Sequence, residues 1–266
     1  MKGLNVSQLS AGYGAVQVLR DLSFSLPSGT VTGVLGANGC GKTTLLKSIC
    51  GILPHTGYCT LHEVSLDGLP ARRMAQLCSY IPQRSGISID ISALDVVLMG
   101  FNPQLGLLEH PTPAMRELAR NMLEQVGLHD RQEVNYLHLS EGQKQLCILA
   151  RTLVSSASLL LMDEPESALD FHYRYRMLEI IRAWVREENR QALVSLHDPA
   201  LALNRCDTLL LLKDGGILGT LRPRQDSLAQ MEPLLTQLYG PVTLTTCAGR
   251  QGQPHIVMLK EREDTP

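Results

Sequence analysis

Hydrophobic and polar residues are arranged along the chain in three ways, and each predicts a different part of the fold. Residues 4–35 hold short alternating runs with turn residues at Gly12 and at 27–29, which predicts an antiparallel β-subdomain. Residues 87–150 carry mainly helical spacing and predict a helical lobe. From 157 to 212, short apolar runs alternate with helical patterns, which favours a mostly parallel sheet. The pattern as a whole predicts an α/β fold.

Two of the expected helices have an apolar face. Within residues 115–126 the face consists of Met115, Leu118, Ala119, Met122, Leu123 and Val126. A second stripe, expected to face the core, consists of Met177, Ile180, Ile181, Trp184 and Val185. Side chains three and four positions apart share one side of a helix, so both segments are expected to pack against other elements.

The end of the chain predicts smaller elements. Residues 228–238 favour a helix that Pro233 interrupts early, because proline lacks the amide that a helix interior needs. Residues 242–246 and 255–259 are expected to form two final strands. The polar residues 261–266 are expected to form a frayed tail.

Residues 36–43 carry the most specific pattern of the chain. They read Gly-Ala-Asn-Gly-Cys-Gly-Lys-Thr and match the phosphate-binding motif G-x-x-x-x-G-K-[ST]. An apolar run at 31–35, which predicts a buried strand, precedes them, and a helix-compatible segment begins near Lys42. The glycines let backbone amides turn toward phosphates, and the helix N-terminus adds partial positive charge. We expect Lys42 to reach the β and γ phosphates and the Thr43 hydroxyl to hold Mg²⁺.

A second buried strand supplies the acids. Residues 159–164 are apolar until they end in Asp163 and Glu164. The carboxyl ends of parallel strands form the edge at which ligands bind, so these acids should emerge there. We expect Asp163 to complete the Mg²⁺ shell and Glu164 to polarise the water that attacks the γ-phosphate.

Between these two motifs, residues 139–143 read Leu-Ser-Glu-Gly-Gln and precede an apolar-periodic helix. Here the chain resembles the nucleotide-binding subunit of ATP-binding cassette (ABC) transporters, whose hallmark is Leu-Ser-Gly-Gly-Gln. The resemblance spans about residues 4–240. It implies a P-loop NTPase fold of the ABC-ATPase type, with a mostly parallel core sheet, an antiparallel β-subdomain and an inserted helical lobe at about 87–150. The ATPase domain would cover 1–240, and 241–266 would add a C-terminal strand pair and tail.

The resemblance also assigns roles to single residues. Tyr13 matches the aromatic that stacks on adenine, and His197 matches the switch histidine that contacts the γ-phosphate. Gln83 matches the glutamine that contacts Mg²⁺ and the attacking water, and residues 167–170 match a loop that crosses the dimer axis. The assigned catalytic residues are Glu164, His197 and Gln83, and the Mg²⁺ ligands are Thr43, Gln83 and Asp163. The residues assigned to ATP are Tyr13, Gly36, Asn38, Gly39, Cys40, Gly41, Lys42, Thr43, Thr44, Ser140, Gly142 and Gln143.

Two positions depart from the family pattern, and both add negative charge near a polyanion. Glu141 replaces the first glycine of the hallmark, and Glu166 stands where the usual Asp-Glu-Pro-Thr-Ser has threonine. Ser140 and the backbone at Gly142 remain available to the γ-phosphate. We expect Glu141 to point toward solvent or a basic partner and, at most, to slow turnover.

The resemblance implies partners as well. ATP would be sandwiched between two copies of the chain, each giving its phosphate loop to one site and residues 140–142 to the other. Transmembrane permease subunits would be driven by this dimer, with a substrate-binding protein acting indirectly. Segments 79–83, 93–100 and 238–240 are similar to ATPases that import iron–siderophore complexes, haem or cobalamin. A zinc or manganese importer, an exporter subunit and a soluble non-transport ABC ATPase stay open as alternatives.

Composition narrows the setting of the protein. A chain of 266 residues with 44% hydrophobic content can bury one sizeable core, and a net charge of −2 argues against nucleic acid as a partner. No run approaches the 18 apolar residues of a membrane span, and the N-terminus lacks an export signal. Seven cysteines without a C-x-x-C pair or metal-ligand spacing indicate free thiols in a reducing compartment, with those other than Cys40 expected to be small buried residues. The cytosol follows, and the permease partner that the resemblance implies would place the chain as a peripheral protein at the cytoplasmic face of the inner membrane.

Overall fold

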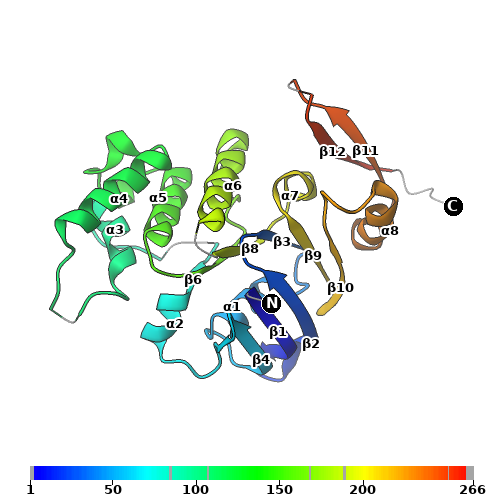
Figure 1. The fold of residues 1–266 in the computed structure, drawn as a ribbon, viewed down its shortest axis with the longest axis horizontal. Helices are drawn as coiled ribbons and strands as arrows, with labels where there is room; N and C mark the ends of the chain where they lie inside the picture. The colour runs from blue at the N-terminus through cyan, green and yellow to red at the C-terminus, as the bar shows by residue number, and fades with distance from the viewer. Residues whose placement is uncertain are drawn as a thin grey trace.

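The structure is a computed structural model that describes residues 3–83, 86–106, 108–167, 169–187, 190–250 and 252–261. Ala168 of the expected dimer-axis loop and residues 262–266 of the expected tail lie outside the described residues. Two sheets and two groups of helices make up the body of the molecule, and a C-terminal hairpin projects from it (Figure 1).

An antiparallel subdomain is confirmed as a four-stranded sheet, but its predicted bounds of 4–35 are wrong, because two of its strands come from residues 55–65 and residues 31–35 join the second sheet. Its order is β2 (Val16–Pro27), β1 (Gly3–Tyr13), β4 (His55–Leu61) and β5 (Val64–Ser65). The turn predicted at Gly12 is wrong, because β1 continues to Tyr13 and turns at Gly14, where φ is 57°. Gly12 instead lies inside the β1–β2 ladder, where a side chain would collide with the backbone of Val16. Glycine is needed there for close approach rather than for the turn.

The second sheet is mostly parallel, as predicted. Its order is β10 (Gly216–Leu221), β9 (Thr208–Lys213), β3 (Val31–Leu35), β8 (Gln191–Ser195), β7 (Leu159–Asp163) and β6 (Cys78–Ile81). β10 alone among these runs antiparallel to its neighbour. Every residue of β3, β7 and β8 is buried. This is the burial that continuous apolar strands require when both faces of a sheet are covered.

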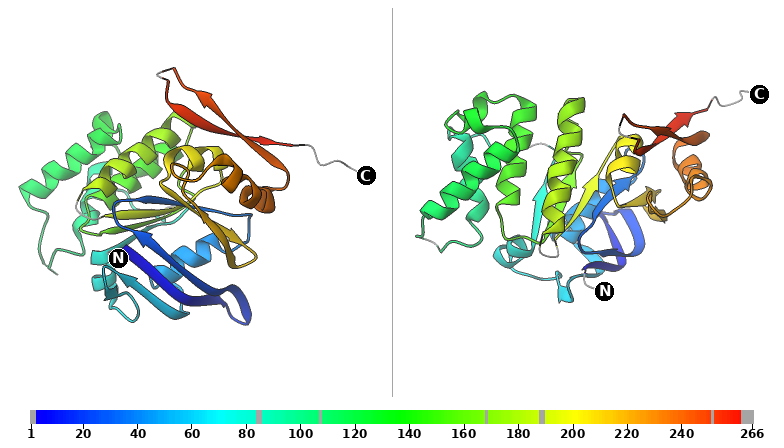
Figure 2. Two further views of the ribbon diagram at one scale, coloured as in Figure 1. Left: turned by 45° about the vertical axis from the view of Figure 1, so that its right-hand side comes forward. Right: turned by 45° about the horizontal axis from the view of Figure 1, so that its top comes forward.

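The two faces of this sheet belong to two hydrophobic clusters. Leu160 and Met162 of β7 pack into a cluster shared with the helical lobe, while Leu159 and Leu161 pack toward the antiparallel sheet. Successive side chains of a strand point to opposite faces, so one apolar strand serves both clusters. The sheet is thereby held between helices on one face and the antiparallel subdomain on the other (Figure 2).

Helices cover the sheet and form the lobe. The lobe contains α3 (Ala93–Leu98), the short helix Met99–Phe101, α4 (Pro113–Gln125), the short helices His129–Arg131 and Tyr136–His138, and α5 (Glu141–Leu153). The remaining helices before the C-terminal region are α1 (Lys42–Ile49), α2 (Ala71–Leu77), α6 (Phe171–Arg186) and α7 (Pro199–Arg205). Figure 1 shows α3, α4 and α5 together at one end of the molecule, beyond β6.

The predicted helix faces are confirmed with one exception. Ala119, Leu123 and Val126 are buried at α4, whereas Leu118 leaves 55% of its surface exposed. An apolar stripe can be wider than the contact that the neighbouring helices make, and Leu118 lies at its margin beside Met122 in a surface cavity between α4, α5 and α6. Along α6 the predicted core stripe is buried or partly buried throughout.

The C-terminal region begins with α8 (Leu228–Tyr239), which continues through Pro233 without interruption. The predicted break is wrong because Met231 and Leu235, on either side of the proline, are fully buried and hold the helix in place. A capping box between Ser227 and Gln230 supports its start. The predicted strands are confirmed as the hairpin β11 (Val242–Ala248) and β12 (Pro254–Lys260).

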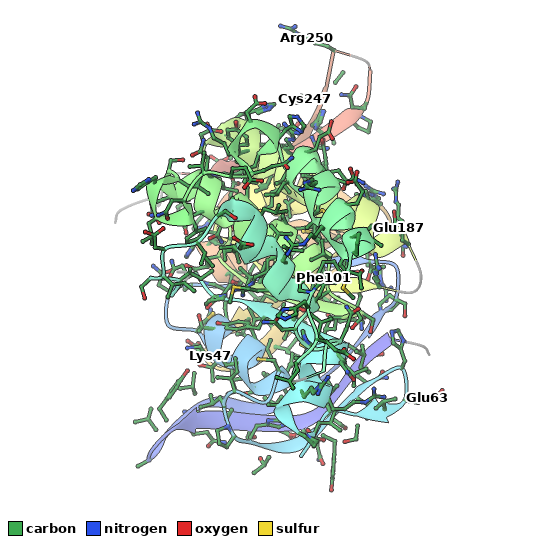
Figure 3. All side chains as sticks on the ribbon, turned by 90° about the vertical axis from the view of Figure 1, so that its left-hand side faces the viewer. Lys47, Glu63, Phe101, Glu187, Cys247 and Arg250 are labelled. Carbon is green, nitrogen blue, oxygen red and sulfur yellow. The ribbon has the colours of Figure 1, made fainter. Side chains whose placement is uncertain are left out.

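All seven cysteines are free thiols. Six of them are buried, but Cys247 lies exposed on the projecting hairpin (Figure 3), so the expectation that it is a small buried residue is wrong. Among the described residues, no helix combines the length and hydropathy that crossing a bilayer requires.

Candidate functional site

The phosphate-binding motif forms the loop between β3 and α1. Gly39 and Gly41 adopt left-handed backbone with φ of 79° and 109°, and a side chain at Gly41 would meet Leu19. The Lys42 ammonium, almost fully buried, donates to the carbonyl oxygens of Gly36 at 2.8 Å and Ala37 at 3.4 Å. Glycine is therefore required for the loop conformation. The Lys42 ammonium is held by carbonyl oxygens of the same loop.

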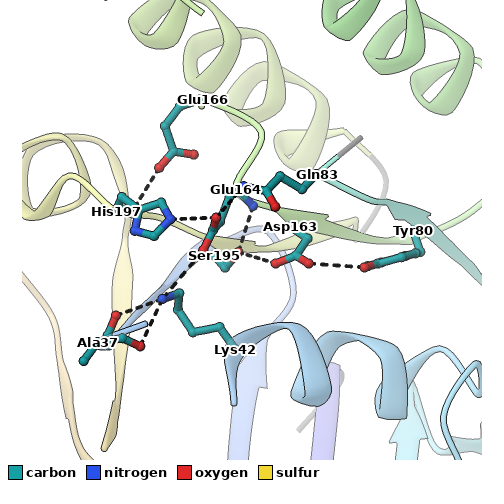
Figure 4. Close-up of polar contacts among 10 residues, drawn as sticks. Ala37, Lys42, Tyr80, Gln83, Asp163, Glu164, Glu166, Ser195 and His197 are labelled. Atoms are coloured by element: carbon teal, nitrogen blue, oxygen red, sulfur yellow. Dashed lines mark hydrogen bonds and ion pairs between the residues drawn. The ribbon is translucent and has the colours of Figure 1, made fainter. Parts of the chain in front are cut away.

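Glu164 connects four separate segments of the chain. Its Oε1 lies 3.7 Å from Lys42 Nζ, and its Oε2 lies 2.6 Å from His197 Nε2 and accepts from Gln83 Nε2 at 2.9 Å (Figure 4). We call Lys42, Gln83, Glu164 and His197 the Glu164 cluster. Its members follow β3, β6, β7 and β8, so the parallel strands bring them to one sheet edge.

The backbone of Glu164 is itself unusual. Its φ of 49° places a non-glycine residue in the left-handed region, a strained conformation that is frequent at functional sites. The Ser195 hydroxyl supports it by accepting from the Glu164 amide at 2.9 Å, and the same hydroxyl donates to Asp163 Oδ1 at 3.0 Å. One serine thus binds the Asp163 carboxylate and the Glu164 backbone (Figure 4).

Tyr80 holds the other oxygen of Asp163. Its hydroxyl donates to Asp163 Oδ2 at 3.4 Å, and burial together with the Asp163 carboxylate raises the pKa of Tyr80 well above its usual value. The phenol consequently stays a donor. Sequence reasoning missed both Tyr80 and Ser195 as site residues. Tyr80 lies three positions before the predicted Gln83, and Ser195 lies two positions before the predicted His197.

Glu166 behaves differently from the expectation that it adds negative charge beside the polyanion. It is buried, and its Oε1 accepts from the His197 backbone amide at 2.7 Å (Figure 4). Its Oε2 has no hydrogen-bond partner within the described part of the chain. Burial raises the pKa of Glu166 above its ordinary value, and the hydrogen bond from His197 offsets part of that rise. Glu166 therefore holds the His197 backbone in place, and burial favours the neutral form of the Glu166 carboxyl.

A cavity of about 510 Å³ opens beside the Glu164 cluster. It brings together ten of the predicted site residues: Tyr13, Asn38, Gly39, Gly41, Lys42, Thr43, Thr44, Gln83, Glu164 and His197. Val18, which sequence reasoning missed, completes the lining. Gly36 and Asp163 contribute through their contacts with Lys42 and Ser195, and buried Cys40 lines an adjoining cavity.

The hallmark residues 139–143, here named the signature segment, lie apart from this cavity: in the described residues, none of them belongs to its lining. Ser140 caps α5, its Oγ accepting from the Gln143 amide at 3.3 Å while its own amide donates to Gln143 Oε1 at 3.0 Å. The Glu141 side chain is 77% exposed and lies 2.8 Å from Lys144 Nζ. The expectation that Glu141 points toward solvent or a basic group is confirmed.

Comparisons with known proteins agree with this geometry. The ABC transporter family profile matches residues 19–167. The "Probable iron chelatin transport ATP-binding protein" of Helicobacter pylori is 36% identical over 79% of this chain and 84% of its own length. The hemin import ATP-binding protein HmuV of Bordetella bronchiseptica is 37% identical over 85% and 88%.

A manganese relative and a solved structure extend the comparison. The manganese transport system ATP-binding protein MntB of Bacillus subtilis is 34% identical over 79% of this chain and 82% of its own length. A solved inward-facing ABC transporter of the metal-chelate type superposes with a TM-score of 0.81 at 27% identity, covering 98% of this chain and 99% of that one. The fold, the arrangement of the site and these likenesses lead to one conclusion: the chain belongs to the ABC transporter family, as an ATP-binding subunit with ATPase activity.

Proposed function

We propose that two copies of this chain together hydrolyse Mg-ATP and thereby drive the uptake of an iron chelate or haem through a membrane-embedded permease. The observation that carries the proposal is the Glu164 cluster, which joins the phosphate loop, the strand-end acid and two polar side chains at the end of one cavity. Such convergence of buried, cross-bonded groups beside a phosphate-binding loop suits phosphoryl transfer to water.

Each member of the cluster has a step to perform. Glu164 would accept the proton of the attacking water, since its carboxylate faces the cavity and is held from two sides. Lys42 would bind the β and γ phosphates, and His197 would contact the γ-phosphate and keep Glu164 in place. Tyr13, which also lines the cavity, offers an exposed aromatic face for adenine.

The residues proposed for Mg²⁺ fit that ion. Thr43, Gln83 and Asp163 supply oxygen donors, which a small hard cation prefers. Asp163 is oriented by Ser195 and Tyr80, as an outer shell should orient a ligand. Bound there, the ion would neutralise charge that develops on the phosphates.

The second copy would complete the site. In the described residues the signature segment does not reach the cavity of its own chain, and Ser140 and Gln143 are exposed or partly exposed at the start of α5. A partner copy facing the cavity would bring its Ser140 hydroxyl and α5 N-terminus to the γ-phosphate, where a helix dipole favours an anion. ATP would then favour the closed pair by its differential affinity for the closed and open states.

The cargo class rests on the relatives. The names of three relatives mention iron chelatin transport, hemin import and petrobactin import, and the superposed structure is a transporter of the metal-chelate type. The manganese relative MntB supports manganese uptake as a second candidate. The permease, an indirectly acting substrate-binding protein and attachment at the cytoplasmic face of the membrane belong to this proposal, as does the division into an ATPase domain at 1–240 and a C-terminal unit at 241–266.

Uptake in cells tests the proposal. A strain lacking this chain is complemented with the wild type, with Glu164→Gln, or with Glu124→Gln, a matched change at an exposed glutamate of α4. We expect wild type and Glu124→Gln to restore uptake of radioactive iron chelate or haem and Glu164→Gln to fail. Restoration of Mn²⁺ uptake alone would favour the second candidate. Equal uptake of all cargoes with and without the chain would overturn the proposal.

A further inference from the structure

A second group of metal-binding side chains lies in the antiparallel subdomain, away from the ATP cavity. His55 opens β4, Cys59 follows four residues later, and Asp67 lies just beyond β5. Their ligand atoms all lie within 4.8 Å of one another. Sequence spacing did not predict this group, because the third member arrives through strand pairing: β5 folds back on β4, with Thr60 opposite Ser65.

We propose that His55, Cys59 and Asp67 bind one Zn²⁺ ion, independently of ATP. The set combines an imidazole, a thiol and a carboxylate. Zinc accepts all three ligand types, whereas Mg²⁺ and Ca²⁺ prefer oxygen alone. Three protein ligands would leave the fourth tetrahedral position for water.

The distances between the ligand atoms suit a tetrahedral ion. His55 Nε2 lies 3.0 Å from Asp67 Oδ1 and 3.8 Å from Cys59 Sγ. Zinc bonds of about 2.0 Å to nitrogen and oxygen and about 2.3 Å to sulfur place such pairs about 3.3 and 3.5 Å apart. The two pairs that include His55 therefore need to move by only about 0.3 Å, and the Cys59 and Asp67 ligand atoms lie within 4.8 Å of each other. A His–Asp ion pair alone would not account for the sulfur beside the same imidazole nitrogen.

The surroundings hold these ligands in position. The Cys59 amide donates to Asp67 Oδ2 at 3.1 Å, which leaves Oδ1 directed at His55. Hydrogen bonds of this kind orient metal-binding carboxylates. Cys59 is fully buried, the His55 side chain is 10% exposed and that of Asp67 is 28% exposed. His55 also lines a surface cavity of about 370 Å³, which provides a route for the ion.

The cost of binding is the proton on the sulfur. Zinc binds the thiolate, so Cys59 must release a proton when the ion arrives. The ion offsets this cost by linking β4 to the segment after β5. Without the ion, the two-residue strand β5 and the hydrogen bonds of Asp67 join these two segments. Zinc that binds the folded chain in this way should raise its melting temperature.

Cobalt serves as the spectroscopic probe of the thiolate. The full chain is first freed of metal with a chelator. One sample is titrated with Co²⁺, and a second is titrated with Zn²⁺ in competition with a chromophoric chelator. Mg-ATP is present in both titrations so that the ATP cavity is occupied. We expect one ion per chain, a thiolate-to-cobalt charge-transfer band, and a rise in melting temperature of about 2 °C or more with Zn²⁺.

Variants locate the ion. Cys59→Ser should abolish the charge-transfer band, and His55→Ala and Asp67→Asn should each weaken Zn²⁺ binding by at least tenfold. The matched controls Cys247→Ser, His110→Ala and Asp130→Asn change exposed residues outside the group and should bind as the wild type does. Retention of the band in Cys59→Ser would overturn the proposal. So would failure of the wild-type chain to bind Co²⁺ or Zn²⁺, a result that does not depend on whether a variant folds.

Discussion

The two parts of the proposed ATP site differ in how complete they are within one chain. At the Glu164 cluster, side chains from four segments are bonded to one another before any second copy is needed. In the signature segment, by contrast, Ser140 and Gln143 hydrogen-bond to each other and cap the start of α5. In the proposed function the cluster is the catalytic half, and the signature segment is a surface that would gain its role when another copy faces it. This contrast predicts that the two halves respond differently to substitution.

The largest effect is expected at the cluster. Glu164→Gln should lower kcat for ATP hydrolysis by about 10²- to 10⁴-fold, the usual contribution of a general base, while ATP affinity stays close to that of the wild type. Steady-state hydrolysis and nucleotide binding measured on the same preparation separate the two quantities. Turnover at the wild-type rate would show that Glu164 is not the base.

A smaller effect is expected at the signature segment. Ser140→Ala should reduce hydrolysis by about ten- to a hundredfold, since a hydrogen bond to a charged group is lost, yet leave ATP binding to a single chain unchanged. Ser140→Thr keeps the hydroxyl and the helix cap and serves as the control. Loss of ATP affinity in a monomeric sample of Ser140→Ala would contradict the division between the halves.

Glu141 should matter least for turnover. Its side chain is exposed and paired with Lys144, so Glu141→Gly should change the hydrolysis rate by less than tenfold while removing an exposed ion pair of about 0–1 kcal/mol. Lys144→Met, which removes the same ion pair, is the comparison. A tenfold or greater drop in Glu141→Gly alone would indicate a positive role for this glutamate.

The smallest effect is a shift in stability at Glu166. Burial raises the pKa of this carboxyl above 4.5, so the fold holds its proton more tightly than the unfolded chain does. Stability is therefore lost as pH rises from the unfolded pKa through the folded one. Glu166→Gln cannot ionise and keeps an oxygen for the His197 amide. Its melting temperature relative to the wild type should rise as pH increases from about 4.5 through the raised pKa of the folded state, and a difference that does not vary with pH would contradict this.

Much of the fold followed from local pattern. The buried strand 31–35 was predicted at the bounds that the structure shows, and the helix begins at Lys42, near where it was predicted to begin. The strand predicted over 159–164 ends one residue earlier, at Asp163. These predictions succeed because glycines, continuous apolar runs and helical spacing act over a few residues. Where prediction failed, neighbours distant along the chain had decided the outcome. Pro233 stays inside α8 because residues on both sides are buried, and Leu118 is 55% exposed because it lines a surface cavity that α5 and α6 leave open beside α4.

By itself, then, the sequence determined the order of the elements, the phosphate loop and the identity of the acids at the strand end, since each depends on short-range backbone preference and hydrophobic period. Only the tertiary structure decided which polar atoms meet. It buried Glu166 beneath the His197 backbone, bonded Ser195 to both the Asp163 carboxylate and the Glu164 amide, and brought Asp67 to His55 and Cys59. Such contacts join residues on different strands, and their geometry is set by sheet register and packing rather than by spacing along the chain.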